Sequence, residues 1–241
     1  MPNVPAAEVV SYGDDANQFM ELWRSEGKAL GAAVFIHGGF WRAKYDLHHA
    51  DEFCTALAEK GIAVANLEYR RVGQLGGGWP GTFEDVVAGV KSAIAHLGKM
   101  PVLIGHSAGG HLALRLANEA IPLQAVVALA PVADLRLAYE LNLSNGAVVE
   151  FLGQTPESMS SRYDEACPSN HTSRANTFVV HGSEDEVVPI AISRTFVQAR
   201  RGDSMPPTLI EIPGAGHMEL IDPKTPAGTA VVELIIRVAQ E

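Results

Sequence analysis

Several short apolar runs recur along the chain, and a segment with helical spacing of apolar residues follows most of them. These runs are almost wholly apolar, which is typical of strands that helices cover on both faces. Regular alternation of strand and helix predicts an open, mostly parallel α/β sheet. We expect strands at 32–39, 62–69, 101–105, 123–131, 176–182 and 208–214, and helices at 47–60, 82–98, 107–120 and 227–240.

Two segments depart from this alternation. Residues 9–12 and 18–23 resemble two short strands of an early hairpin. Residues 134–175 are polar, irregular and rich in Ser and Asn, so we expect a small cap or lid there, inserted into one domain that spans 1–241. At the helix ends, Gly61 suits a C-terminal cap and Thr82 an N-terminal cap.

Length, charge and cysteine content narrow the class of protein. The chain has 241 residues, 47% of them hydrophobic, and a formal net charge of −10, which argues against nucleic-acid binding. Cys54 and Cys167 form no CxxC pair and predict free thiols in a reducing compartment. We find no signal-peptide pattern and no apolar run long enough to span a bilayer. These features predict a cytoplasmic protein that binds neither nucleic acid nor a membrane, and they leave a homodimer open.

The pentapeptide Gly105-His106-Ser107-Ala108-Gly109 lies between an apolar strand and a helix-like segment. This context is typical of a nucleophile elbow, in which a serine on a strained turn exposes its hydroxyl above the sheet. Small residues must flank the serine because strand and helix cross closely there. The alternative is a glycine-rich helix start with a capping serine.

A serine hydroxyl needs a general base, and that base needs an acid to orient it. The acid and then the histidine follow such a serine along the chain. His217 lies in a glycine-flanked loop after the last expected strand, and it is our candidate base, although a surface-loop histidine would look similar.

The candidate acid is Asp185, which follows the strand expected at 176–182. Both loops leave strand ends, from which side chains can reach over the carboxyl edge of the sheet. Glu184 and Glu186 are rivals beside Asp185, and Asp134, after an earlier strand, is the second choice.

An oxyanion hole requires donors where negative charge develops on the substrate carbonyl. One expected donor is the N–H group of Ala108, and the others are those of Gly39 and Phe40 in the loop 37–41, where the run 32–39 ends in glycines. We expect His37 to brace this loop. Phe40 and Trp41 are candidate substrate-binding walls, with core packing as the alternative for both.

The other histidines do not form a recognisable metal site. His48 and His49 are adjacent and would point apart on a helix, and His96 and His111 look like surface or packing residues. No His, Cys and Asp cluster has convincing ligand spacing, so we expect neither a metal nor a cofactor.

Together these motifs give a family resemblance that spans nearly the whole chain. The sequence resembles the α/β-hydrolase superfamily, and within it the kynurenine formamidase-like and hormone-sensitive-lipase-like esterase branch. Where Phe40 stands, lipase-like relatives more often have a third glycine. The motifs are HGGFW (37–41), EYRR (68–71), GHSAGG (105–110), HGSEDEVVP (181–189) and GAGHMELIDP (214–223).

The resemblance implies an α/β-hydrolase fold of about eight strands, with helices on both faces of the sheet. It implies a serine carboxylesterase in which Ser107 attacks an ester or small amide, His217 moves the proton and Asp185 orients the imidazole. The main alternative is an arylformamidase acting on N-formylkynurenine. An acyltransferase and a non-catalytic binding protein on the same fold also remain open.

Overall fold

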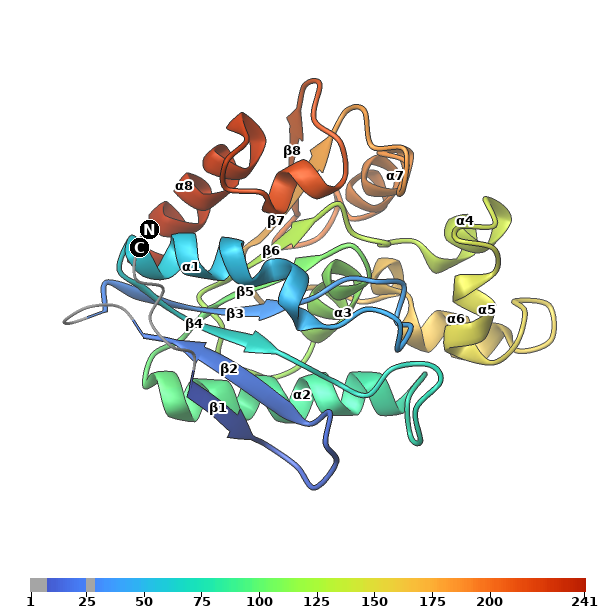
Figure 1. The fold of residues 1–241 in the computed structure, drawn as a ribbon. Coiled ribbons are helices and arrows are strands. Elements are labelled where there is room, and N and C mark those ends of the chain that lie inside the picture. Colours follow the sequence, from blue (N-terminus) through green and yellow to red (C-terminus); the bar gives the residue numbers. More distant parts are fainter. Residues whose placement is uncertain (1–7, 25–28) are drawn as a thin grey trace.

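The computed structural model describes residues 8–24 and 29–241, which form one eight-stranded sheet with helices on both faces (Figure 1). The strand order is β1-β2-β4-β3-β5-β6-β7-β8. The strands are β1 (Glu8–Ser11), β2 (Phe19–Trp23), β3 (Gly31–Ile36), β4 (Ile62–Leu67), β5 (Val102–His106), β6 (Ala125–Leu129), β7 (Thr177–Gly182) and β8 (Thr208–Ile212).

The sheet is parallel from β4 to β8, and its first two strands form the expected antiparallel hairpin. Strand β2 joins this hairpin to the rest through an antiparallel pairing with β4, in which Met20 lies opposite Leu67. In the parallel part, Phe35 of β3 lies between Asn66 of β4 and Ile104 of β5. The carboxyl ends of β3, β5, β7 and β8 therefore meet at one edge, where the candidate site residues follow.

Each face of the sheet has its own apolar core. Within β3, Val34 and Ile36 join the core on one face, whereas Ala33 and Phe35 join the core on the other. Helices α1 (Asp51–Glu59) and α8 (Pro226–Gln240) cover the Phe35 face. Helices α2 (Gly81–Leu97), α3 (Ala108–Leu116) and α7 (Ala191–Ala199) cover the other. Burial on both faces explains why these strands are nearly all apolar in sequence.

The structure corrects one helix end and confirms another. Helix α2 begins at Gly81 after Pro80, so Thr82 lies inside the helix and is not its N-cap. Its hydroxyl donates to the carbonyl of Arg70 and accepts from the N–H of Gly78, which ties the helix to the preceding loop. Gly61 follows α1 with a φ of 87°, as expected for a residue that ends a helix. A 3₁₀ turn, η1 (Leu47–Ala50), precedes α1.

Residues 134–175 form an excursion between β6 and β7. It holds three short helices, α4 (Leu135–Glu140), α5 (Ala147–Leu152) and α6 (Ser160–Ala166), and a 3₁₀ turn, η2 (Pro168–Asn170). The three helices gather at one end of the sheet, beyond the carboxyl ends of β3 and β4 (Figure 1). Their inner residues, among them Phe151 and Tyr163, belong to the same core as α2 and α3.

Both cysteines are buried free thiols, in agreement with the sequence. Among the helices described, none combines the length and apolar character that a bilayer crossing requires.

His111 on α3 is a fully buried polar group in the core beneath the excursion. Its Nε2–H donates to the carbonyl of Ala166 at 3.0 Å, and its Nδ1 has no hydrogen-bond partner within the described residues. Burial lowers the pKa of the His111 imidazole to about 3. The ring therefore stays neutral in the folded state at pH values where an exposed histidine takes up a proton.

This low pKa predicts an acid-dependent loss of stability. Between the pKa of an unfolded histidine and the folded value, the unfolded chain binds the extra proton, so stability falls as pH falls. From pH 7 to pH 5, we expect the His111 contribution to decrease by about 2 kcal/mol. Urea unfolding of the native chain and of His111→Gln at both pH values measures this contribution. The native chain's advantage in the free energy of unfolding over the variant should decrease by that amount between pH 7 and pH 5. A difference that stays constant with pH would contradict the prediction.

Candidate active site

Ser107 occupies a strained turn between β5 and α3. Its φ of 57° and ψ of −116° lie outside the regions that residues with a Cβ normally adopt, at a cost of about 1–3 kcal/mol. The turn is held by its neighbours, because the N–H of Ser107 donates to Leu129 at 2.8 Å and its carbonyl accepts from Val132 at 3.2 Å. Backbone hydrogen bonds to the neighbouring strand β6 and to the segment after β6 therefore hold Ser107 in its strained conformation.

The glycines on either side of Ser107 allow the close crossing that the sequence predicts. A Cβ on Gly105 would collide with the backbone of Gly109 in α3. A Cβ on Gly109 would collide with the carbonyl oxygens of Ile36 and His37 at the end of β3. Any larger residue would push α3 away from the sheet and move Ser107 with it.

His217 and Asp185 meet beyond the ends of β8 and β7. The Nδ1–H of His217 donates to Oδ2 of Asp185 at 2.6 Å. The other ring nitrogen, Nε2, is therefore the one that can accept a proton from the cleft. The second carboxylate oxygen, Oδ1, accepts from the N–H groups of Val187 and Val188, both at 2.8 Å. Hydrogen bonds therefore fix the carboxylate on both of its oxygens.

Sequence reasoning did not assign a role to His181, which also touches this carboxylate. Its Nε2 lies 2.8 Å from the carbonyl of Val188 and 3.3 Å from Oδ2 of Asp185, and its Nδ1 lies 2.7 Å from the Ser193 hydroxyl. Burial raises the pKa of Asp185, but hydrogen bonds from His181 and His217 and the charge of His217 outweigh burial and hold it below its usual range. The acid stays ionised beside the imidazole.

The rival acids lie elsewhere. Glu184 and Glu186 are exposed. Asp134 caps the N-terminus of α4, where its carboxylate accepts from the N–H groups of Arg136 and Leu137 at 3.0 Å. Of the four candidates, the structure places Asp185 against His217.

His106, the residue before Ser107, holds the His217 loop. Its Nε2–H donates to the carbonyl of His217 at 3.1 Å, and the two rings lie 4.5 Å apart. Burial, and then the charge of His217, lower the pKa of His106 well below its ordinary value, so its ring is a neutral spacer between the two loops.

The loop after β3, residues 38–41, contains two of the N–H groups that we expect to bind an oxyanion, and we call it the oxyanion loop. Gly39, Phe40 and Trp41 have φ values of 106°, 51° and 58°, so three successive residues adopt left-handed backbone. Within the described residues, the N–H groups of Gly39 and Phe40 have no hydrogen-bond acceptor. Ala108 opens α3, where N–H groups lack partners inside the helix. All three donors remain available to a ligand.

Ser107 and His217 line the same cleft, which has a volume of about 330 Å³. Phe40 forms part of its wall, as expected for a substrate-binding residue. Trp41 does not: it is fully buried and stacks on Phe151 of α5, with ring centroids 4.4 Å apart. The expectation that Trp41 faces the substrate is therefore wrong. The lining residues are Gly39, Phe40, Tyr45, His49, His106, Ser107, Val187, His217 and Met218.

The cleft wall is largely apolar, and histidines are the only ionisable side chains other than Tyr45 among the lining residues described. None of the lining residues described is Asp, Glu, Lys or Arg. His49 keeps an exposed edge, yet the protein packed around it, and then the neighbouring His37, lower the pKa of its imidazole to about 4. His49 therefore contributes a neutral ring to the wall.

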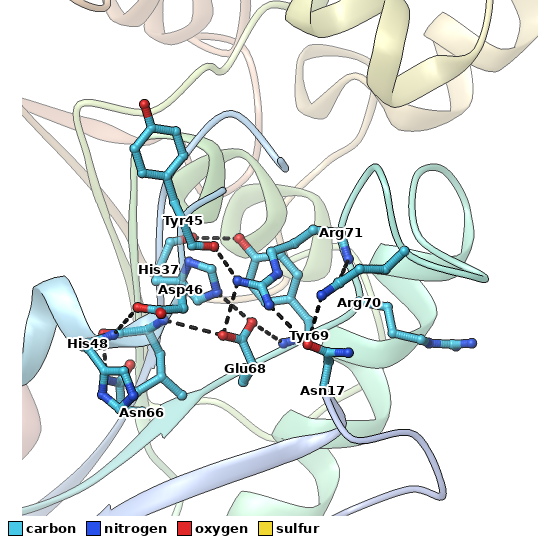
Figure 2. Close-up of polar contacts among 12 residues, drawn as sticks. Asn17, His37, Tyr45, Asp46, His48, Asn66, Glu68, Tyr69, Arg70 and Arg71 are labelled. Carbon is cyan, nitrogen blue, oxygen red and sulfur yellow. Dashed lines mark hydrogen bonds and ion pairs between the residues drawn. The ribbon is translucent and has the colours of Figure 1, made fainter. Parts of the chain in front are cut away.

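A buried carboxylate, Glu68, ties the oxyanion loop to the cleft wall (Figure 2). Its Oε1 accepts from Nε2–H of His37 at 2.9 Å and from the N–H of Tyr69 at 2.8 Å. Its Oε2 accepts from the N–H of Leu47 at 3.3 Å and pairs with Arg71 at 3.2 Å. Arg71 also donates to the carbonyl of Tyr45 in the cleft wall.

These contacts confirm that His37 braces the loop. Its ring stacks on Tyr69 with centroids 4.3 Å apart, and the Tyr69 hydroxyl donates to the His37 carbonyl at 2.7 Å. Glu68, part of the EYRR motif, joins His37 to the Tyr45–Leu47 segment, although nothing in the motif itself predicts this role. Its importance depends on partners that the sequence does not reveal.

Replacing Glu68 should destabilise the protein strongly. Glu68→Gln leaves Arg71 buried without its counter-ion, and we expect a loss of about 3–5 kcal/mol in the free energy of unfolding. Glu119→Gln is the matched control, because Glu119 pairs with Arg115 at 2.9 Å but is 38% exposed. That variant should lose at most about 1 kcal/mol. Equal losses in urea unfolding would contradict the role given to Glu68.

One group outside the cleft could hold a metal ion. Glu21, His48 and Asp51 bring one ligand atom each within 4.8 Å of one another, and His48 Nδ1 lies 3.3 Å from Asp51 Oδ2. His49 faces the cleft instead, so the adjacent histidines do not act as a pair. The group touches neither Ser107 nor His217.

Comparison with known proteins identifies esterases and a formamidase among the relatives of this chain. The model of the BD-FAE family matches residues 22–199. Esterase LipC of Mycobacterium tuberculosis is 28% identical, and the match covers 88% of this chain and 60% of that protein. A kynurenine formamidase of Meyerozyma guilliermondii is 30% identical over 118 residues, or 47% of this chain and 43% of that protein. The chain spans about 60% of the length of the first curated relatives it matches.

A solved structure gives the same fold. The esterase Est2 of the Planctomycetes species Thermogutta terrifontis has a TM-score of 0.75 at 23% identity, covering 97% of this chain and 91% of that chain. This likeness establishes the α/β-hydrolase fold expected from the sequence.

Proposed function

The chain belongs to the BD-FAE family, and from this membership and the site geometry we propose that it is a serine hydrolase of the carboxylesterase type. The observation that carries the proposal is the arrangement of three groups. Ser107 and His217 line one cleft, and Asp185 lies 2.6 Å behind the His217 ring. Esterases among the relatives and structural neighbours support the same activity.

In the proposed reaction, Nε2 of His217 takes the proton of Ser107 as its Oγ attacks the ester carbonyl carbon. Asp185 keeps the other ring proton on Nδ1 and stabilises the imidazolium. The N–H groups of Gly39, Phe40 and Ala108 hold the oxyanion. His217 then protonates the departing alcohol, and water, deprotonated by the same ring, releases the acid from the acyl-enzyme.

The buried free cysteines support a cytoplasmic location for this activity.

The cleft wall favours a neutral ester over N-formylkynurenine. That formamide carries a charged amino group and a charged carboxylate, and a buried site would have to pair both. The lining residues described offer no Asp, Glu, Lys or Arg for this purpose, whereas Phe40, Tyr45 and Met218 offer apolar surface. The formamidase relative, matched over less than half of the chain, keeps that activity as the second candidate.

Covalent labelling tests the proposal directly. A fluorophosphonate probe should form one adduct on Ser107, detected by mass spectrometry of the intact chain and its peptides. Ser107→Ala should form no adduct and lose esterase activity. An unlabelled, folded native chain would instead support the non-catalytic binding protein.

Removing the acid should reduce catalysis while leaving the serine in place. Asp185→Asn should lower kcat by about 10³–10⁴-fold, because the imidazole then loses its preferred tautomer. Asp134→Asn is the control for the rival acid, and it should change stability little, because asparagine caps a helix about as well as aspartate. If Asp134→Asn lost activity and Asp185→Asn kept it, the assignment would be wrong.

Substrate charge should decide the rate. We expect kcat/KM for a neutral short-chain aryl ester to exceed that for N-formylkynurenine, because only the latter must desolvate two charges. Formanilide, an uncharged formamide, separates the effects of bond type and charge. Faster turnover of N-formylkynurenine than of either neutral compound would favour the arylformamidase.

A further inference from the structure

The oxyanion loop is strained at two bulky residues. Phe40 and Trp41 both have positive φ values, 51° and 58°, in a region that such side chains rarely adopt. Strained backbone persists only where its surroundings hold it. The side-chain contacts of this loop therefore determine whether the N–H groups of Gly39 and Phe40 stay in place.

Trp41 is held by the excursion. Its ring stacks on Phe151 of α5 at 4.4 Å with an interplanar angle of 12°, and His111 of α3 meets it edge-on at 5.2 Å. Phe151 is itself 1% exposed. The N–H of Trp79 donates to its carbonyl at 2.9 Å, which anchors this part of the excursion to the loop before α2.

Arg42, the next residue, makes a second link to the excursion. Its guanidinium binds both carboxylate oxygens of Glu150, at 2.6 and 3.0 Å. It also donates to the hydroxyl and carbonyl of Ser144, both at 2.8 Å. Because the Arg42 guanidinium makes four hydrogen bonds to two residues, it fixes both the distance and the orientation of the excursion relative to the loop.

The excursion holds the loop without forming the cleft. None of the lining residues described belongs to 134–175. A lid that selects substrates would be expected to contribute to that wall, whereas Ser144, Glu150 and Phe151 contact Trp41 and Arg42 behind it.

We propose that residues 144–151 are a buttress for the oxyanion loop, with Phe151 and Glu150 as positioning residues that keep Phe40 and Trp41 in their left-handed conformation. This inference rests on the proposed esterase activity. The buttress acts on the transition state, because the loop donors meet the oxygen atom only when it carries negative charge. Loosening the buttress should therefore change kcat and leave KM nearly unchanged.

The test uses two variants of the full chain and two matched controls. Phe151→Leu removes the stacked ring, and Glu150→Gln removes the charge that binds Arg42. Phe196→Leu, on α7, removes a buried ring from the same core but away from the loop. Glu140→Gln removes an exposed charge at the end of α4.

We expect Phe151→Leu to lower kcat by about 10–100-fold with KM within twofold, and Glu150→Gln to lower it by a smaller factor. The inhibition constant of a trifluoromethyl ketone, whose adduct carries an oxyanion, should rise by the same factor as kcat falls. Both controls should keep kcat, even where Phe196→Leu lowers the melting temperature. Phe151→Tyr, which retains the stacked ring, should keep kcat close to that of the native chain.

Amide NMR shifts of Gly39 and Phe40 provide a readout that needs no turnover. They should move in Phe151→Leu and Glu150→Gln and stay in place in the controls. Unchanged kcat and shifts in both variants would overturn the buttress, and so would a change in KM alone, which indicates a lid. If Phe151→Leu fails to fold, Glu150→Gln provides the test, because the Glu150 side chain is 46% exposed and its replacement should not prevent folding. A native chain without esterase activity would instead refute the proposed function.

Discussion

Ser107 can occupy its turn because the backbones of β3, β5 and α3 approach one another closely around it. Gly109 packs against the carbonyls of Ile36 and His37, and Gly105 packs against Gly109. The carbonyls that Gly109 touches belong to the residues just before the oxyanion loop. The close backbone contacts at Gly105 and Gly109 therefore set both the position of Ser107 and its distance from the loop. Because backbone atoms make these contacts, a larger residue could not be accommodated by a side-chain movement.

The sequence predicts most of the sheet because burial on both faces leaves a composition that few other structures share. The strands around Phe35 and Val127 are apolar in every position, and each of the expected strands is present. Helix α7 and the helices of the excursion were not predicted. The helices of the excursion have six or seven residues each, which is too few turns for periodicity to stand out from irregular sequence. Thr82 shows a different limit, because a contact with Arg70 overrides its preference for a cap.

The candidate site divides into residues that local context predicts and residues that only topology reveals. Ser107, Asp185 and His217 each lie just beyond a strand, where glycines or turn residues mark the end of the sheet. Trp41 has the same kind of neighbourhood, yet it faces Phe151, which is distant in sequence and lies in a segment without a recognisable motif. His181 and Glu68 are polar residues in apolar surroundings, and their partners become visible only once β7 and β4 are placed.

The two sides of the cleft are ordered by different forces. On one side, the N–H groups of Val187, Val188 and His217 donate to the two oxygens of Asp185. These polar contacts fix the acid and through it the His217 ring. On the other side, the strained backbone at Phe40 and Trp41 depends on aromatic packing and on the Arg42 fork. Hydrogen bonds are directional, whereas stacked rings can slide at little cost. The stacking of Trp41 on Phe151 is therefore the most adjustable of these contacts, and sequence changes in the excursion would act on it without touching Asp185 or His217.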